Sequence, residues 1–190
     1  MSATNAPFGM RPAFHPSGLD RAQAQADGIL SGYTSDILKG QPVKMDTSGQ
    51  IQVAAAGDSF LGAFAGTEWT DTTGRRRVSN YWPANTAYQT GSCVAYYYND
   101  PLIVYEIQAA GSLAATSVGD EANLSNTTAG SNVTGLSQCT LSTTLTGAGN
   151  NAQMRIVDLA PIPGNAWGDA YTIVRATISK HQYTAVTNAV

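Results

Sequence analysis

Apolar and polar positions alternate over short runs along most of the chain, and residues typical of turns separate these runs. In residues 101–109, Ile103, Tyr105 and Ile107 would line one face of a strand, and Glu106 would lie on its solvent face. A period of two residues is typical of a half-buried strand. No segment keeps an apolar period of 3.6 residues, so the sequence predicts little helix.

Two hairpins are predicted in the first half of the chain, over residues 43–53 and 67–82. Each has an Asp-initiated turn that ends in glycine, Asp-Thr-Ser-Gly in the first and Asp-Thr-Thr-Gly in the second. Such turns between apolar runs are a signature of β-hairpins. Residues 154–159 and 171–180 are predicted as two further strands, and each face of the last one is at least half buried.

Residues 1–27 contain Pro7, Pro12 and Pro16 and only scattered apolar side chains. Prolines at this spacing exclude a regular helix or a central strand. We therefore predict an extended N-terminal arm, with room for a single helical turn in residues 20–26.

The remaining residues, 28–190, are predicted to form one β-rich body. A chain of 190 residues falls within the usual range of one domain. Turn residues recur every eight to twelve positions or so, which favours a compact β-barrel or β-sandwich. Residues 111–151 are rich in Ser, Thr, Asn and Gly, and we expect short exposed strands joined by loops there. The predicted fold class is all-β.

Composition narrows the function classes. Charged residues make up 12% of the chain, the hydrophobic fraction is 43%, and the net charge is −3. A disordered chain would be richer in charge, and a chain that mainly binds nucleic acid would be basic. No apolar run is long enough to span a bilayer and no secretory signal is recognisable, so we expect a protein made in a cell's cytoplasm, with no membrane partner and no direct nucleic acid contact.

Few residues suggest chemistry. His15 and His181 stand outside any catalytic motif, and the acidic residues form no paired signature. Cys93 and Cys139 lack the spacing of a zinc site; two buried thiols are favoured, and a bridge between them stays open. We predict no enzymatic activity, no metal and no cofactor. The carboxylates considered by type are Glu68, Asp71, Glu106, Asp120 and Glu121, of which Asp120 and Glu121 follow Gly119 and are predicted to lie in a turn.

Arg75, Arg76 and Arg77 form the one concentrated charge feature, and Tyr81 and Trp82 follow them closely. Arginine, tyrosine and tryptophan are typical of the energetically dominant residues of protein interfaces, so these five form a possible interface. Single-stranded nucleic acid binding and a solvated hairpin tip are the alternatives.

Several stretches resemble tailed-bacteriophage head cement or decoration proteins. Residues 6–18, Ala-Pro-Phe-Gly-Met-Arg-Pro-Ala-Phe-His-Pro-Ser-Gly, are similar to the N-terminal arm of these proteins. Residues 37–45 and 57–64 resemble the strand-turn-strand opening of head decoration domains, and residues 165–171 resemble their closing segment.

The resemblance implies a structural virion protein on the outer surface of the capsid. It would bind the phage major capsid protein as a trimer or dimer and stabilise contacts between capsid subunits. The arm would stay mobile in the free protein and become ordered where its side chains find pockets on neighbouring subunits. The expected capsid contacts of the arm are Phe8, Met10, Arg11, Phe14, His15 and Leu19.

The alternative is a carbohydrate- or receptor-binding module of a phage tail or fibre. The run Tyr96-Tyr97-Tyr98, with Trp82 and Trp167, contains aromatic rings of the kind that stack on sugars. Aromatic residues in strands more often pack in the core or across strands, which is the competing interpretation.

Overall fold

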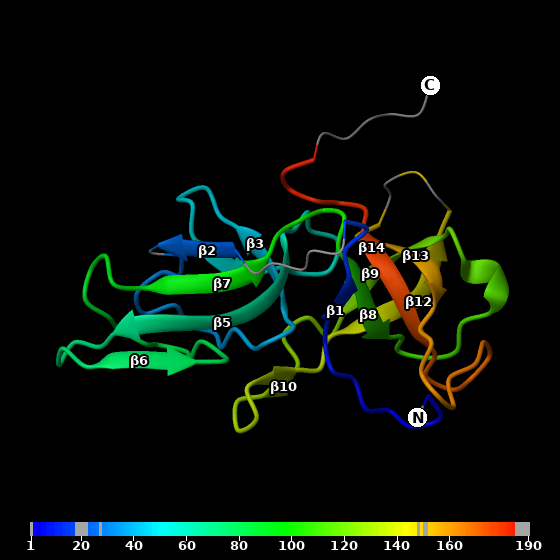
Figure 1. Cartoon of the computed structure of the whole chain (residues 1–190), viewed down its shortest axis with the longest axis horizontal. Coiled ribbons are helices and arrows are strands. Elements are labelled where there is room, and N and C mark those ends of the chain that lie inside the picture. Colours follow the sequence, from blue (N-terminus) through cyan, green and yellow to red (C-terminus); the bar gives the residue numbers. More distant parts are fainter. Residues whose placement is uncertain (1, 18–22, 27, 148, 150–151, 185–190) are drawn as a thin grey trace.

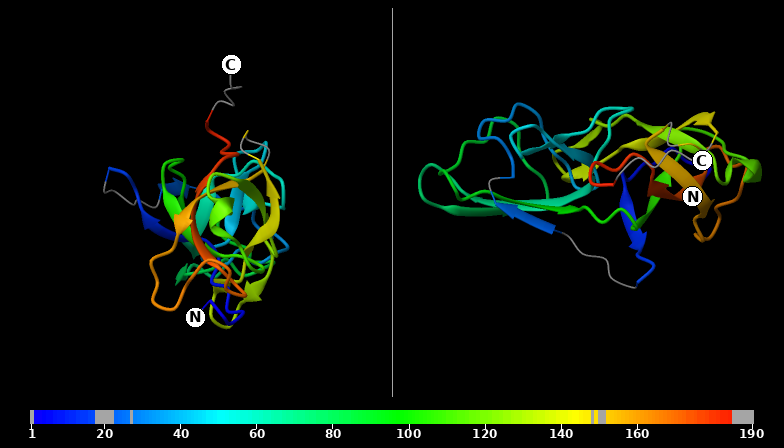
Figure 2. Two further views of the ribbon diagram at one scale, coloured as in Figure 1. Left: turned by 90° about the vertical axis from the view of Figure 1, so that its right-hand side faces the viewer. Right: turned by 90° about the horizontal axis from the view of Figure 1, so that it is seen from above.

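The computed structural model describes residues 2–17, 23–26, 28–147, 149 and 152–184, with the backbone alone in 23–26. The chain is all-β, as the sequence predicts, and a 3₁₀ turn (η1, Ala115–Ser117) supplies the helical structure of this described part. Two antiparallel sheets, A and B, lie side by side along the long axis of the molecule, as Figure 1 and Figure 2 show.

Sheet A contains six strands in the order β1-β8-β14-β13-β9-β12. Their bounds are Arg11–Phe14 (β1), Val104–Gln108 (β8), Ile173–Ile178 (β14), Met154–Leu159 (β13), Glu121–Ser125 (β9) and Thr140–Thr146 (β12). An isolated bridge between Ala109 and Leu141 brings β12 back toward the end of β8, so the sheet curls around its core (Figure 2). Pro12 lies in the edge strand β1, where a missing N–H disturbs the ladder least.

Sheet B has the order β2-β7-β5-β3-β4, and β6 also pairs with β5. Its strands are Gln23–Ala26 (β2), Val94–Tyr98 (β7), Gly62–Thr70 (β5), Pro42–Met45 (β3), Ile51–Val53 (β4) and Arg76–Ser79 (β6). A separate hairpin of β10 (Gly130–Ser131) and β11 (Leu136–Ser137) projects from the body beside the two sheets (Figure 1).

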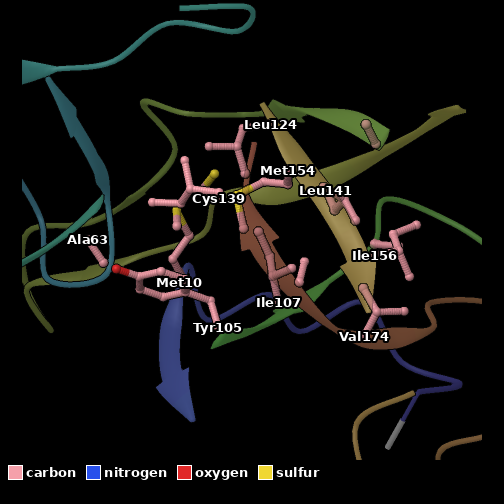
Figure 3. Close-up of a cluster of buried hydrophobic side chains, with 14 of the residues drawn as sticks. Met10, Ala63, Tyr105, Ile107, Leu124, Cys139, Leu141, Met154, Ile156 and Val174 are labelled. Atoms are coloured by element: carbon pink, nitrogen blue, oxygen red, sulfur yellow. The ribbon is translucent and has the colours of Figure 1, made fainter. Parts of the chain in front are cut away.

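Each sheet covers its own cluster of buried side chains. Core A, shown in Figure 3, lies within sheet A and includes Met10, Tyr105, Ile107, Leu124, Cys139, Leu141, Met154, Ile156 and Val174. Core B lies against sheet B and includes Ile37, Val43, Leu61, Phe64, Trp69, Trp82 and Tyr97. The segment that enters β5 contributes to both, because Phe60 and Ala63 belong to core A whereas Leu61 and Phe64 belong to core B. This segment therefore forms a seam between the two cores.

Both predicted hairpins are confirmed, as β3–β4 and β5–β6. The carboxylate of Asp46 accepts the backbone N–H of Ser48 and of Gln50, at 2.8 Å each. Asp71 does the same for Thr73 at 2.9 Å, so an Asp-initiated turn has a direct physical cause in both hairpins. Strands β13 and β14 confirm the two predictions nearer the C-terminus.

The predicted solvent face of β8 is wrong. Every residue of this strand is buried, with Glu106 9% exposed and Gln108 1% exposed. The alternation is real, but the N-terminal residues cover the outer face. Arg11 pairs with Glu106, and the amide group of Gln108 is bonded to the backbone of the N-terminal segment.

Two smaller predictions also need correction. Residues 23–26, placed in a helical turn, form strand β2, which pairs with β7; residues 20–22 lie outside the described part. Glu121, interpreted as a turn residue, begins β9 with its side chain fully buried. In residues 111–151, β10 and β11 are short as expected, but β9 and β12 place Leu124 and Leu141 in core A.

Candidate protein-binding surface

The first described residues pack along the body of the same chain. The side-chain amide of Gln108 donates to the Thr4 carbonyl at 3.1 Å and accepts the Ala6 N–H at 3.0 Å. The Met10 N–H donates to the Gly40 carbonyl at 2.8 Å. The side chain of Met10 is 1% exposed and lies in core A among Tyr105, Ile107 and Cys139 (Figure 3).

The packing at Gly9 is very close. This residue has a φ of +74°, and a Cβ placed on it would lie 2.6 Å from the Gly40 carbonyl oxygen and 2.9 Å from Cβ of Ser137. Glycine is the residue that tolerates both the left-handed backbone and the contact. The N-terminal segment thus crosses directly over the 39–40 backbone.

This crossing borders a pocket of about 240 Å³, which we call the arm-lined pocket. Two of its lining residues are buried core residues, each 1% exposed: Met10 belongs to core A and Phe64 to core B. The pocket therefore lies over the seam between the two cores. Leu136, from the β10–β11 hairpin, is 45% exposed. The lining residues are Phe8, Met10, Arg11, Pro12, Lys39, Gly40, Phe64, Tyr98 and Leu136.

Two cationic side chains, Arg11 and Lys39, line this apolar pocket. The Arg11 guanidinium lies 4.7 Å from the centre of the Phe8 ring, and its Nη2 lies 2.5 Å from a carboxylate oxygen of Glu106. Arg175 lies 3.6 Å from the other oxygen of the same carboxylate, so one acid is shared by two arginines. Lys39 is exposed and has no ion-pair partner among the residues that the structure describes.

The structure brings three of the six predicted arm contacts, Phe8, Met10 and Arg11, into the arm-lined pocket. Phe14 lies further along β1, is 40% exposed, and has the Arg175 guanidinium 5.2 Å from its ring centre. His15 lies 3.2 Å from Asp100. Leu19 lies outside the described residues.

Sequence reasoning missed the other walls of the pocket. Lys39, Phe64, Tyr98 and Leu136 come from four separate segments. The glycine at position 40, beside Lys39, was the local signal in the sequence, since glycine is the residue that adopts a positive φ most readily, and its φ is +80° in the structure. Nothing local in the sequence shows that these segments meet.

The five residues of the second predicted interface differ in their exposure to solvent. Arg75, Arg76 and Arg77 are exposed at the tip of the β5–β6 hairpin, and Tyr81 is half-buried. Trp82, in contrast, is fully buried in core B, and its ring centre lies 5.3 Å from that of Trp69. Trp82 is therefore a core residue and cannot contact a partner directly.

Two of the three arginines have acidic partners within the hairpin. Arg76 pairs with Glu68, and Arg77 lies 3.0 Å from Asp71. The hydroxyl of Thr73, together with the Arg75 N–H, holds the pKa of Asp71 well below its usual range. The hairpin tip is therefore less cationic than its sequence indicates.

Of the five aromatic residues considered for sugar stacking, Tyr97 and Trp82 are buried, and the other three are half-buried. Tyr97 is 3% exposed and belongs to core B, as Trp82 does. The Tyr96 hydroxyl donates to Glu68 at 3.1 Å, and Trp167 packs against core A. The buried rings of Tyr97 and Trp82 are therefore not available to stack on a sugar.

His181 is 4% exposed, and its Nδ1 accepts the Tyr183 N–H at 3.1 Å. Burial lowers the pKa of His181 below 6.5, although nearby backbone groups and Asp100 act in the opposite direction. The folded protein thus keeps this imidazole neutral at a pH where the unfolded chain begins to protonate it.

We therefore expect the free energy of unfolding to fall as the pH drops below about 6.5, by at most about 1.4 kcal/mol per pH unit from this single proton. Urea denaturation at pH 7.5 and 5.5 measures the loss. His181→Gln should reduce this loss in the free energy of unfolding. Because the other titrating groups are the same in both proteins, the difference between the two losses reports on His181. An equal loss in the variant would contradict the assignment.

Both cysteines are buried as thiols. Cys93 belongs to core B and Cys139 to core A, so the bridge left open by the sequence is not formed. Burial raises the pKa of the Cys139 thiol to about 12, which makes it unreactive at neutral pH. Within the described ranges, no three metal-ligating side chains gather, and no helix has the length and hydropathy of a membrane span.

The chain was compared with family models, curated proteins and solved structures, and none of them matches it.

Proposed function

We propose that this chain is a structural virion protein that binds the outer surface of a tailed-phage capsid and stabilises contacts between major capsid protein subunits. The observation that carries the proposal is the arm-lined pocket, an apolar depression with a cationic border built partly by the segment that resembles cement-protein arms. Pockets of this kind anchor the large side chains that dominate protein–protein affinity.

The physical requirements of such a role agree with the surface. Leu136 is 45% exposed beside the pocket, which Arg11 and Lys39 also line, and Phe14, 40% exposed, lies further along β1. A homo-oligomer, a trimer or dimer, would present several copies of this surface to one repeating shell, and multivalent binding strengthens the attachment without new contacts. A protein that binds the assembled shell favours that state by mass action.

The test uses phage heads that lack this protein, prepared by deleting its gene from the phage that encodes it. Purified protein should co-sediment with the heads and raise the temperature at which they release DNA. Gold-labelled protein should decorate heads in micrographs. Failure to sediment with the heads, or label on the tails, would contradict the proposal and favour the receptor-binding alternative.

Point variants locate the surface better than deletion of residues 1–27, because that deletion removes Met10 from core A and two strands from the sheets. Leu136→Ser should weaken head binding by about tenfold, since it removes one large apolar contact. Val157→Ser is the matched control, because Val157 is 42% exposed and lies on β13, away from the pocket lining. Equal binding by both variants would show that the arm-lined pocket is not the contact.

A further inference from the structure

We infer that the arm-lined pocket recognises one large apolar side chain together with an aspartate or glutamate carboxylate next to it in a protein segment. The inference rests on the proposed function, because it describes the segment of the capsid partner that this chain would bind. It goes further by stating the chemistry of that segment.

The volume of the pocket limits what it can hold. About 240 Å³ is below the roughly 300–1,000 Å³ of sites that enclose a drug-sized ligand. Met10 and Phe64, both 1% exposed, place core residues at this site, and Phe8 and Leu136 offer further apolar surface. A single phenylalanine-sized or leucine-sized side chain suits these dimensions and this polarity.

The backbone around the pocket is held by several hydrogen bonds. Gly40 donates its N–H to Phe64 at 2.8 Å and accepts from Met10 at 2.8 Å. Lys39 donates to the Gly135 carbonyl at 2.9 Å and accepts from the Ser137 N–H at 3.0 Å. The N-terminal segment, β5 and the β10–β11 hairpin are therefore fixed together at residues 39–40, so little ordering free energy remains to oppose binding.

The charge at the border selects an acidic neighbour. Lys39 is exposed without an ion-pair partner among residues of the described ranges, and Arg11 keeps further N–H donors because one of its five is used on Glu106. Since Glu106 is shared with Arg175, it does not neutralise both arginines. This cationic border belongs to a chain whose net charge is −3.

The probe is the tripeptide acetyl-Glu-Phe-Glu-amide, which carries the apolar side chain and flanking carboxylates. Acetyl-Gln-Phe-Gln-amide removes the charges, and acetyl-Glu-Ala-Glu-amide removes the ring. Titration into ¹⁵N-labelled full chain should shift the amide signals of Gly40, Phe64 and Leu136. Binding by the acidic Phe peptide should be about fivefold tighter than by its amide isostere, and the difference should shrink at high salt.

Lys39→Gln should remove most of the preference for the acidic peptide. The Lys39 side chain is exposed and makes no ion pair with the residues that the structure describes, so the variant should stay folded. Lys180→Gln removes a lysine outside the pocket lining and should leave the preference intact. Shifts elsewhere on the protein, equal affinity for the two Phe peptides, or no effect of Lys39→Gln would overturn the inference.

These outcomes are separable from those of the head-binding test. If heads bind and the peptides do not, the recognition chemistry is wrong and the proposed function stands. If the peptides bind as described and heads do not, the pocket is real but its partner is not the capsid.

Discussion

Replacing Gly9 with alanine is expected to lower the free energy of unfolding by about 3–4 kcal/mol. About 1–2 kcal/mol comes from forcing an L-residue into the left-handed backbone. The rest comes from the new Cβ, which would meet the Gly40 carbonyl at 2.6 Å and push the N-terminal segment away. Because Met10 follows directly, the shift would draw its side chain out of core A, and large cavities in cores cost about 2–5 kcal/mol.

Gly32→Ala is the matched control. Gly32 has a φ of +78°, close to the +74° of Gly9, and nothing lies within 4 Å of a Cβ placed there. Its cost should therefore be the backbone strain alone, about 1–2 kcal/mol. Urea denaturation of both variants gives the comparison. Equal losses would show that the N-terminal segment is not an integral part of the fold.

Replacing Arg155 with leucine is expected to lower the free energy of unfolding by about 3 kcal/mol. The guanidinium lies 2.7 Å from Glu121, whose side chain is 0% exposed. Ser179 and the Ala152 N–H also donate to that carboxylate, at 3.1 Å each. Without Arg155 the buried carboxylate loses this cation, and breaking a buried ion pair by removing one partner costs about 3–5 kcal/mol.

Two further variants separate the ion pair from the general effect of losing an arginine. Arg77→Leu breaks the pair with Asp71, where the arginine side chain is 52% exposed, and should cost less than about 1 kcal/mol. Adding Glu121→Gln to Arg155→Leu should restore part of the lost stability, because the buried charge is gone. A double variant as unstable as the sum of both single changes would contradict this account.

The hairpins were predictable because their signals are local. Asp46 and Asp71 each hold a turn through bonds to residues two and four positions on, all within one short stretch of sequence. The period of two in β8 was equally visible. The sequence did not show that the N-terminal segment covers the polar face of that strand, because Arg11 lies far from its partner Glu106 in sequence.

The candidate site was predictable in its residue types but not in its geometry. Phe8, Met10 and Arg11 were selected as anchors for a partner, yet Met10 packs within its own chain. An apolar residue among prolines has the same appearance in sequence whether it binds a partner or its own body. Trp82 shows the same error, since a residue predicted for an interface is in fact a core residue.

The contacts of the N-terminal segment also limit the order in which parts of the fold can form. The Ser2 carbonyl accepts the Tyr171 N–H at 2.7 Å, so this bond can form only after the 169 residues that follow Ser2 have been synthesised. Strand β1 must likewise wait for β8. A chain that is still being synthesised therefore lacks the complete arm-lined pocket until Leu136 has been added and the N-terminal segment has packed against it.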